Sequence, residues 1–182
     1  MVVEAFQDLI QSNAAYAGGF AHGDLPAPPR RNLAVVTCMD ARVDAYAVLG
    51  LEPGDAHVLR NAGARSTDDV VRSLIKSIHQ LGVTRVAIVH HTDCGAAKIQ
   101  LDVLRSQVAE RTGHDPVDVD FHLIADEDQS IIDDVEALAS SPYLPAGIAV
   151  AGFMYDVRTG LLDPRHSATV GGFPESADLD SE

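Results

Sequence analysis

The sequence predicts an α/β protein in which a mostly parallel β-sheet is flanked by helices. Short apolar runs rich in β-branched residues alternate with longer segments whose apolar residues recur at helical spacing. Glycine and proline residues separate these segments, as they do at turns. The 182 residues are enough for one domain with a sizeable core, so we treat residues 1–182 as a single domain.

The amino-terminal part, residues 1–31, is expected to form a helix and a proline-rich arm. Residues 4–17 are predicted to be helical and amphipathic, and Gly18 and Gly19 end this helix. The prolines between residues 26 and 29 make a stiff connection to the first strand.

The first two strands are predicted at residues 33–37 and 56–59. The first is short, apolar and β-branched, as a buried strand is, whereas the second carries a weaker signal. Between them, residues 43–49 are predicted to be helical and to stop at Gly50.

The best-signalled helix follows a turn at Asn61-Ala62-Gly63. Ser66, with Asp69 three residues later, resembles a capping box that begins a helix. Apolar residues then follow at helical spacing, and Gly82 ends the helix. These apolar residues are Val70, Val71, Leu74, Ile75, Ile78 and Leu81.

Strands and helices continue to alternate in the second half of the chain. Strands are predicted at residues 85–90 and 147–155, with an added C-terminal edge strand at residues 161–162. Helices are predicted at residues 96–110 and 131–138. We expect residues 115–128 to be an acidic loop and residues 175–182 to be a disordered acidic tail.

The composition excludes several kinds of partner. A formal net charge of −14 argues against binding to nucleic acid or to an anionic membrane. No apolar run is long enough to span a bilayer, and the first residues lack the pattern of a secretory signal. We therefore expect a cytoplasmic protein with no nucleic-acid partner and no membrane partner.

The only two cysteines suggest a metal site. Cys38 follows the first strand, while His91 and Cys94 follow the strand predicted at residues 85–90. Ligands of open α/β sheets bind past the carboxyl ends of the strands, so the three side chains can meet if these strands are neighbours. Two thiolates and an imidazole suit zinc, and three firm ligands with a replaceable fourth are typical of catalytic zinc. The sequence is less consistent with a metal-free redox protein, since the cysteines do not form a Cys-x-x-Cys pair.

These segments resemble the motifs of the β-class carbonic anhydrases. The matching segments are Cys38-Met39-Asp40-Ala41-Arg42, Arg60-Asn61-Ala62-Gly63 and His91-Thr92-Asp93-Cys94, and the likeness extends from about Asn32 to Tyr155. The resemblance implies reversible hydration of carbon dioxide to bicarbonate and a proton by zinc-bound hydroxide. It implies one Zn²⁺ per chain, held by Cys38, His91 and Cys94, in a zinc-dependent catalytic domain. It also implies a homodimer or a dimer of dimers.

Asp40 and Arg42 are implied as a dyad beside the metal. In an extended segment, residues 38, 40 and 42 point the same way, so all three can reach one site. Two roles for Asp40 remain open. It occupies the fourth zinc position and closes the site, or it pairs with Arg42 and leaves that position to hydroxide.

Other residues near the motifs have simpler interpretations. Gly63 permits close approach of the backbone to the site. Asp93 is expected to be a turn residue or a helix cap, and His90 a strand residue with a satisfied hydrogen bond.

Two other functions remain open. A related zinc hydrolase could act on carbonyl sulfide or carbon disulfide, which are linear like carbon dioxide. A non-catalytic zinc-binding protein would have Asp40 permanently in the fourth position.

Overall fold

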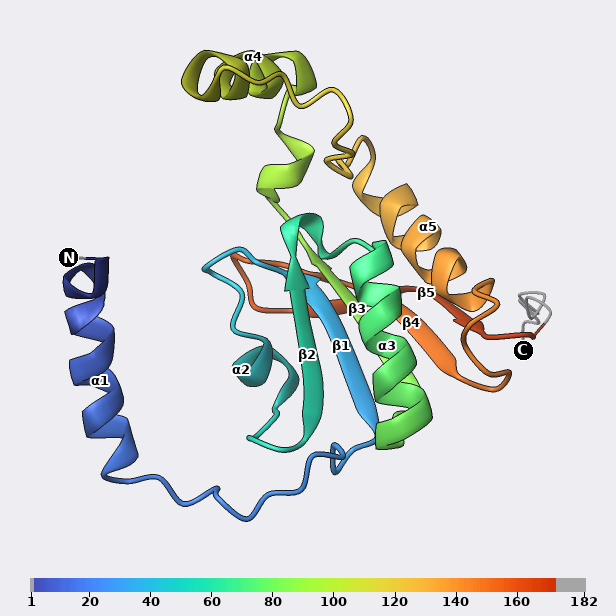
Figure 1. Ribbon diagram of the computed structural model, residues 1–182. Coiled ribbons are helices and arrows are strands. Elements are labelled where there is room, and N and C mark those ends of the chain that lie inside the picture. The colour runs from blue at the N-terminus through green and yellow to red at the C-terminus, as the bar shows by residue number, and fades with distance from the viewer. Residues whose placement is uncertain (1, 173–182) are drawn as a thin grey trace.

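Five strands form a single sheet in the order β2-β1-β3-β4-β5 (Figure 1). The computed structural model describes residues 2–172. The strands are β1 (Leu33–Cys38), β2 (Ala56–Asn61), β3 (Arg85–His91), β4 (Ala149–Tyr155) and β5 (Leu162–Thr169). β1 to β4 run parallel, and β5 pairs antiparallel with β4 at the edge. The predicted fold class, including the added edge strand, is confirmed.

Helices connect the parallel strands. The α-helices are α1 (Gln7–Ala17), α2 (Ala45–Leu49), α3 (Asp68–Leu81), α4 (Leu101–Thr112) and α5 (Glu127–Ala139). Short 3₁₀ helices are η1 (Val2–Phe6), η2 (Ala62–Ala64) and η3 (Gly95–Ala97). Within residues 2–172, none of these helices combines the length and the apolar character that crossing a bilayer requires.

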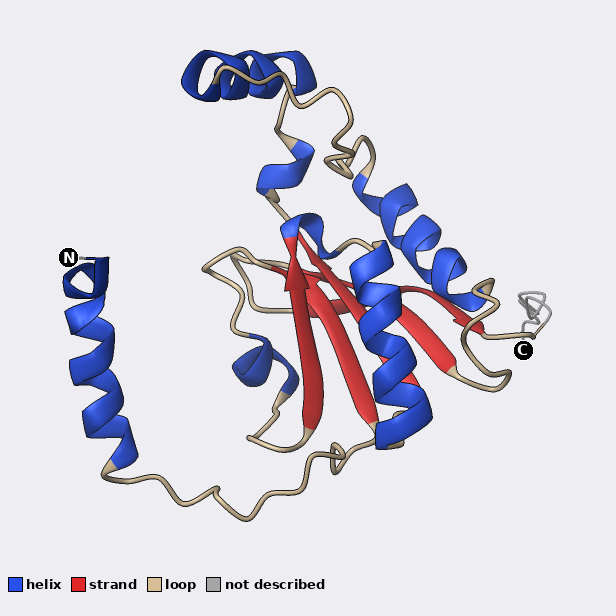
Figure 2. Ribbon diagram, in the orientation of Figure 1, coloured by secondary structure: helices blue, strands red, loops and turns tan. Residues whose placement is uncertain are grey.

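The main core lies between the sheet and two helices. α3 and α5 lie on the same face of the sheet (Figure 2). Leu74 of α3 and Leu138 of α5 belong to one buried cluster with Val36, Ile88 and Val150 from the strands. Burial of these apolar side chains is the main source of stability for the layer.

The opposite face of the sheet is covered less completely. Val35 and Val89 are buried there in a cluster with Leu51, which follows the short α2. Phe153 and Tyr155 of β4 pack against this cluster but remain half-buried. An apolar sheet face that the chain's own helices leave half-covered is suited to contact with another molecule.

The predicted helix at residues 96–110 is wrong in its first part. The structure has η3 and then a break, and α4 begins only at Leu101. Gln100 is extended, with φ −93° and ψ 119°, and none of the described side chains of α4 is buried. The apolar spacing that suggested one long helix therefore has no core to pack against, and packing rather than propensity decides helix length.

The predicted capping box is also wrong. Thr67, not Ser66, caps α3 by accepting a hydrogen bond from the Val70 amide. Ser66 instead donates its hydroxyl to the backbone carbonyl of Asp134, 2.9 Å away on α5. The Ser66 hydroxyl therefore binds a distant acceptor on α5, although the local spacing had predicted that it caps α3.

β5 is longer than the two residues predicted. It has eight residues, most of them exposed, so its sequence lacks the apolar pattern of a core strand. Pro164 lies where the register with β4 shifts, between the pairs Phe153–Pro164 and Gly152–His166. Edge strands and bulges are where proline is tolerated in sheets. The predicted acidic tail at 175–182 lies outside the described residues.

Candidate metal centre

Two neighbouring strands bring the predicted ligands together. β1 pairs in parallel with β3 from Leu33–Arg85 to Thr37–Val89, so Cys38 and His91 emerge at the same edge. Cys94 returns to that edge three residues later. The ligand atoms of Cys38, His91 and Cys94 all lie within 4.8 Å of one another, and all three residues are buried. The two cysteines are free rather than disulfide-bonded.

His91 presents a free nitrogen to the two sulfurs. Its Nδ1 lies 2.9 Å from the Thr92 carbonyl oxygen, which can only accept, so Nδ1 carries the hydrogen. Nε2 then holds the lone pair, and it makes no hydrogen bond with any described residue although it is buried. A backbone carbonyl that orients an imidazole in this way is typical of metal-binding histidines.

The two sulfurs compete for one proton. They are 3.9 Å apart. A hydrogen bond with Cys94 lowers the pKa of Cys38 well below its usual range, against the opposing effect of burial. The same contact, together with burial, raises the pKa of Cys94 well above its usual range. A bound cation would remove this conflict, because it stabilises both thiolates.

The backbone closes one side of the cluster. The Gly63 amide donates to Cys38 Sγ at 3.4 Å, and Gly63 has a left-handed φ of 87°. A Cβ at this position would lie 3.2 Å from both Ala96 Cβ and Ile124 Cδ1. The close approach predicted for Gly63 is therefore present, and Ala96 and Ile124 form an apolar wall beside the cysteines.

Asp40 and Arg42 form a bidentate pair beside the cluster. Arg42 Nε donates to Asp40 Oδ1 at 3.0 Å, and Nη2 donates to Oδ2 at 2.8 Å. The Arg42 guanidinium holds the pKa of Asp40 well below its usual range, so the carboxyl is ionised at neutral pH. Asp40 Oδ2 lies 3.8 Å from His91 Nε2. The carboxylate is thus near the cluster but held by arginine.

Sequence reasoning missed the part that Asp93 plays. Its carboxylate accepts from Arg42 Nη1 at 2.8 Å and also pairs with Lys98, whose hydrogen bond is the main reason that the pKa of Asp93 falls to about 2. Asp93 has a left-handed φ of 61°, as expected of the predicted turn residue. Arg42 is therefore held between two carboxylates, one from each motif. The only available signal was the place of Asp93 inside the second motif.

His90 points away from the cluster. Its Nε2 lies 3.1 Å from Asp134 Oδ2 on α5, and the residue is 2 % exposed. The predicted hydrogen bond is therefore present at Nε2, whereas Nδ1 of His90 is buried and makes no hydrogen bond with any described residue.

Comparisons with known proteins agree with this geometry. A profile of the family described as "Carbonic anhydrase" matches residues 33–116. "Beta-carbonic anhydrase 1" of Mycobacterium tuberculosis is 39 % identical over 156 residues, which cover 86 % of this chain and 94 % of the relative. The crystal structure of carbonic anhydrase from Streptococcus mutans is 42 % identical, with a TM-score of 0.82, over 88 % of this chain and 97 % of that one.

A second group of relatives carries another name. "Carbon disulfide hydrolase" of Acidithiobacillus thiooxidans is 31 % identical over 159 residues, which cover 76 % of this chain and 79 % of the relative. The proteins from Mycobacterium tuberculosis and Streptococcus mutans match this chain at higher identity and over more of its length than this hydrolase does. With the sheet, the paired motifs and the Cys-His-Cys cluster in agreement, the chain belongs to the β-carbonic anhydrase family.

Proposed function

We propose that this protein catalyses the reversible hydration of carbon dioxide to bicarbonate, using one Zn²⁺ per chain held by Cys38, His91 and Cys94. The observation that carries the proposal is the buried cluster of two sulfurs and an unpartnered Nε2 beside a bidentate Asp40–Arg42 pair. Three ligands of this kind fit zinc and leave a position for substrate chemistry. When bound there, zinc lowers the pKa of a water ligand and so supplies a nucleophile near neutral pH.

The role proposed for Asp40 is to accept a hydrogen from the reacting water at Oδ2. The bidentate contact with Arg42 fixes the carboxylate plane, and the contact with Asp93 fixes the guanidinium in turn. This arrangement supports the open form of the site, because a carboxylate engaged by arginine is less available as a fourth ligand. The apolar wall of Ala96 and Ile124 suits an uncharged substrate.

Stopped-flow measurement of carbon dioxide hydration across pH tests the proposal. The wild type should be active, with turnover rising toward alkaline pH, because two thiolates donate more electron density to zinc than imidazoles would. Asp40→Asn should retain zinc but lose activity by about 10²-fold, in line with the loss of a proton acceptor. Asp69→Asn, at an exposed aspartate of α3, is the matched control and should behave as the wild type. Stoichiometric zinc with no hydration at any pH would favour a non-catalytic zinc protein.

Hydrolysis of carbon disulfide or carbonyl sulfide is the second candidate, because a relative with that name covers most of the chain. Turnover of each substrate by the same zinc-loaded preparation separates the candidates. Faster hydrolysis of carbon disulfide than hydration of carbon dioxide would reverse our assignment.

A homodimer, or a dimer of dimers, is part of the proposal. α1 stands away from the sheet at the end of an extended arm (Figure 1), and none of its described side chains is buried. An isolated helix of eleven residues is only marginally stable in water. Phe6, Leu9, Ile10 and Tyr16 are each about half exposed or more on this arm. We expect a second copy to cover the arm and so to stabilise its helix. The half-buried sheet face is suited to the same kind of contact.

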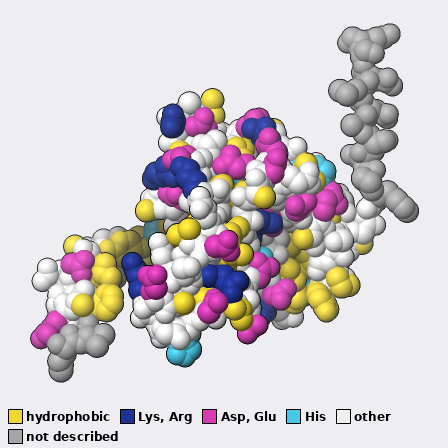
Figure 3. Space-filling view, turned by 90° about the horizontal axis from the view of Figure 1, so that it is seen from above, with side chains coloured by type: hydrophobic (Ala, Val, Ile, Leu, Met, Phe, Trp, Pro, Cys, Tyr) yellow, Lys and Arg dark blue, Asp and Glu magenta, His cyan; other side chains and the backbone are white. Residues whose placement is uncertain are grey.

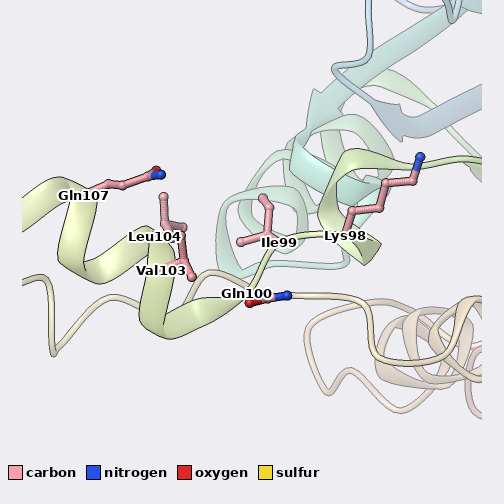
Figure 4. Close-up of a pocket in the computed structure, with 6 residues that line it drawn as sticks. All are labelled: Lys98, Ile99, Gln100, Val103, Leu104 and Gln107. Atoms are coloured by element: carbon pink, nitrogen blue, oxygen red, sulfur yellow. The ribbon is translucent and has the colours of Figure 1, made fainter.

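A second uncovered surface lies along α4. An open groove of about 400 Å³ runs beside Ile99, Val103 and Leu104 (Figure 4). It starts at Lys98, which pairs with Asp93 next to the proposed metal ligands. Contact between copies at this groove would therefore be close to the metal centre.

We also propose that the protein is cytoplasmic and binds neither nucleic acid nor membranes. Acidic side chains are spread between the basic ones on the face seen in Figure 3, and the net charge is −14. Such a surface repels polyanions. Both cysteines are free, which suits a reducing compartment.

A further inference from the structure

We propose that Asp134 of α5 is a positioning residue for the metal centre: its buried carboxylate joins the strand that carries His91 to the loop that contacts Cys38. The inference deepens the proposed function and rests on a metal binding to Cys38, His91 and Cys94. Asp134 is 3 % exposed and lies outside all of the motifs. A buried carboxylate is costly unless it is paired and hydrogen-bonded, so its partners indicate what it holds.

The first partner is the end of β3. Asp134 Oδ2 lies 3.1 Å from His90 Nε2, and His90 is directly followed by the proposed ligand His91. A carboxylate only accepts hydrogen bonds, so Nε2 of His90 carries the hydrogen. This contact fixes the buried His90 ring against α5, and with it the backbone that turns His91 toward the two sulfurs.

The second partner is the loop after η2. Arg65 Nε lies 2.8 Å from Asp134 Oδ2 as an ion pair without hydrogen-bond geometry, and the Ser66 amide donates to Oδ1 at 2.7 Å. The Asn61 side chain bridges the amide and the carbonyl of Arg65, at 2.9 and 2.7 Å, which closes the turn that holds Gly63. Because the Gly63 amide donates to Cys38 Sγ, the contacts run without a break from α5 to a proposed ligand.

Arg65 carries the network to a third segment. Its Nη1 donates to the carbonyl oxygens of His122 and Leu123, at 3.4 and 3.3 Å. The next residue, Ile124, is 5 % exposed and packs in the cluster that contains Cys38 and Cys94. Loss of the Asp134 charge would leave the Arg65 cation without its partner and would loosen all three segments at once.

The test compares Asp134→Asn with Asp133→Asn, its exposed neighbour on α5. Each protein is loaded with Co²⁺, and its visible absorption and the rate of metal release to a chelator are recorded. We expect Asp134→Asn to show altered absorption bands and release at least about tenfold faster, the scale seen for residues that orient metal ligands. Asp133→Asn should match the wild type.

A purely structural role predicts a different result. If Asp134→Asn melts at a lower temperature but keeps the wild-type spectrum and release rate, the inference is wrong. If the full-length protein with Asp134→Asn does not fold, Arg65→Lys takes its place in the test. This substitution keeps the positive charge but is too short to reach the carbonyl oxygens of His122 and Leu123. It should change spectrum and release rate in the same direction, and an unchanged pair of readings would also overturn the inference. Failure of the wild type to bind Co²⁺ would instead refute the proposed metal site.

Discussion

At the scale of single residues, the chemistry depends on which group holds the Asp40 carboxylate. Arg42 makes two side-chain hydrogen bonds to it and a third through its backbone amide, at 2.9 Å. Asp93 and Lys98 extend the same network on the other side of Arg42. We therefore propose that Arg42 decides whether Asp40 serves the reacting water or closes the metal site.

Arg42→Ala should lower turnover by on the order of 10²-fold, since it frees Asp40 to become a fourth ligand and loses an oriented acceptor. Carbon dioxide hydration and zinc content, measured on the same sample, check this. Asp93→Asn should lower turnover less than Arg42→Ala does, because it leaves the bidentate contact between Arg42 and Asp40 intact. Unchanged turnover in Arg42→Ala would count heavily against the dyad.

Individual residues also show which parts of the site could be predicted from the sequence and which could not. Cys38, His91 and Cys94 were found because their chemistry and spacing form local motifs. Asp134 was not, because its partners His90 and Arg65 lie 44 and 69 positions away and no local pattern marks them. Ser66 was assigned to the wrong role for the same reason: its partner is on another helix.

At the scale of elements, the site depends on how closely α5 lies against the sheet. Gly152 of β4 makes that approach possible, since a Cβ there would lie 2.3 Å from Ile131 Cγ2 and 3.0 Å from Val135 Cγ2. A glycine inside a strand often marks such a contact. α5 in turn carries Asp134, which contacts His90 of β3 and Ser66 of the loop after η2.

Gly152→Ala should destabilise the protein by about 1–3 kcal/mol, the usual range for overpacking a core. Urea denaturation followed by circular dichroism measures the change. Gly19→Ala is the control, because a Cβ there meets nothing within 4 Å, and it should shift stability far less. Equal stability of Gly152→Ala and the wild type would mean that α5 packs differently from the description above.

A second element-scale prediction concerns the turn before β2. The Glu52 amide, and secondarily Arg30, lower the pKa of Asp55. A lowered carboxyl pKa adds stability above the unfolded pKa of about 3.9, and this is lost as the pH falls through the folded value. Asp55→Asn should therefore lower the urea midpoint at pH 7, and the difference should shrink below about pH 4. A difference that is constant with pH would contradict the assignment.

Secondary structure was predictable wherever burial follows the pattern of the segment. β1, β3, α3 and α5 are buried on one side or both, and their spacing in the sequence shows it. α4 and β5 are exposed, and their limits were predicted wrongly: α4 has apolar spacing but no core to pack against, and β5 has no apolar pattern. The parallel pairing of β1 and β3 was inferred from the shared metal site and not from the strands themselves.

At the scale of the whole molecule, one protomer leaves apolar surface uncovered. The arm with α1, the groove along α4 and the sheet face near Phe153 are all incompletely buried. These surfaces support the proposed homodimer, because exposed apolar area favours association in water.

Replacing Leu9 and Ile10 together with aspartate should shift the protein toward monomers, because both side chains are exposed on α1 of the single chain. Size-exclusion chromatography with light scattering gives the mass directly. Replacing Gln11 and Asn13, two exposed polar residues of the same helix, with aspartate is the matched control and should leave the mass unchanged. A wild type that is already monomeric at micromolar concentration would refute the dimer.

X-ray absorption at the zinc edge of the purified holoprotein tests the central claim most directly. Our account predicts two sulfur ligands at about 2.3 Å and one imidazole nitrogen at about 2.0–2.1 Å, with a single lighter ligand completing the tetrahedron. A spectrum with fewer than two sulfur ligands, or a protein that holds no zinc, would contradict it.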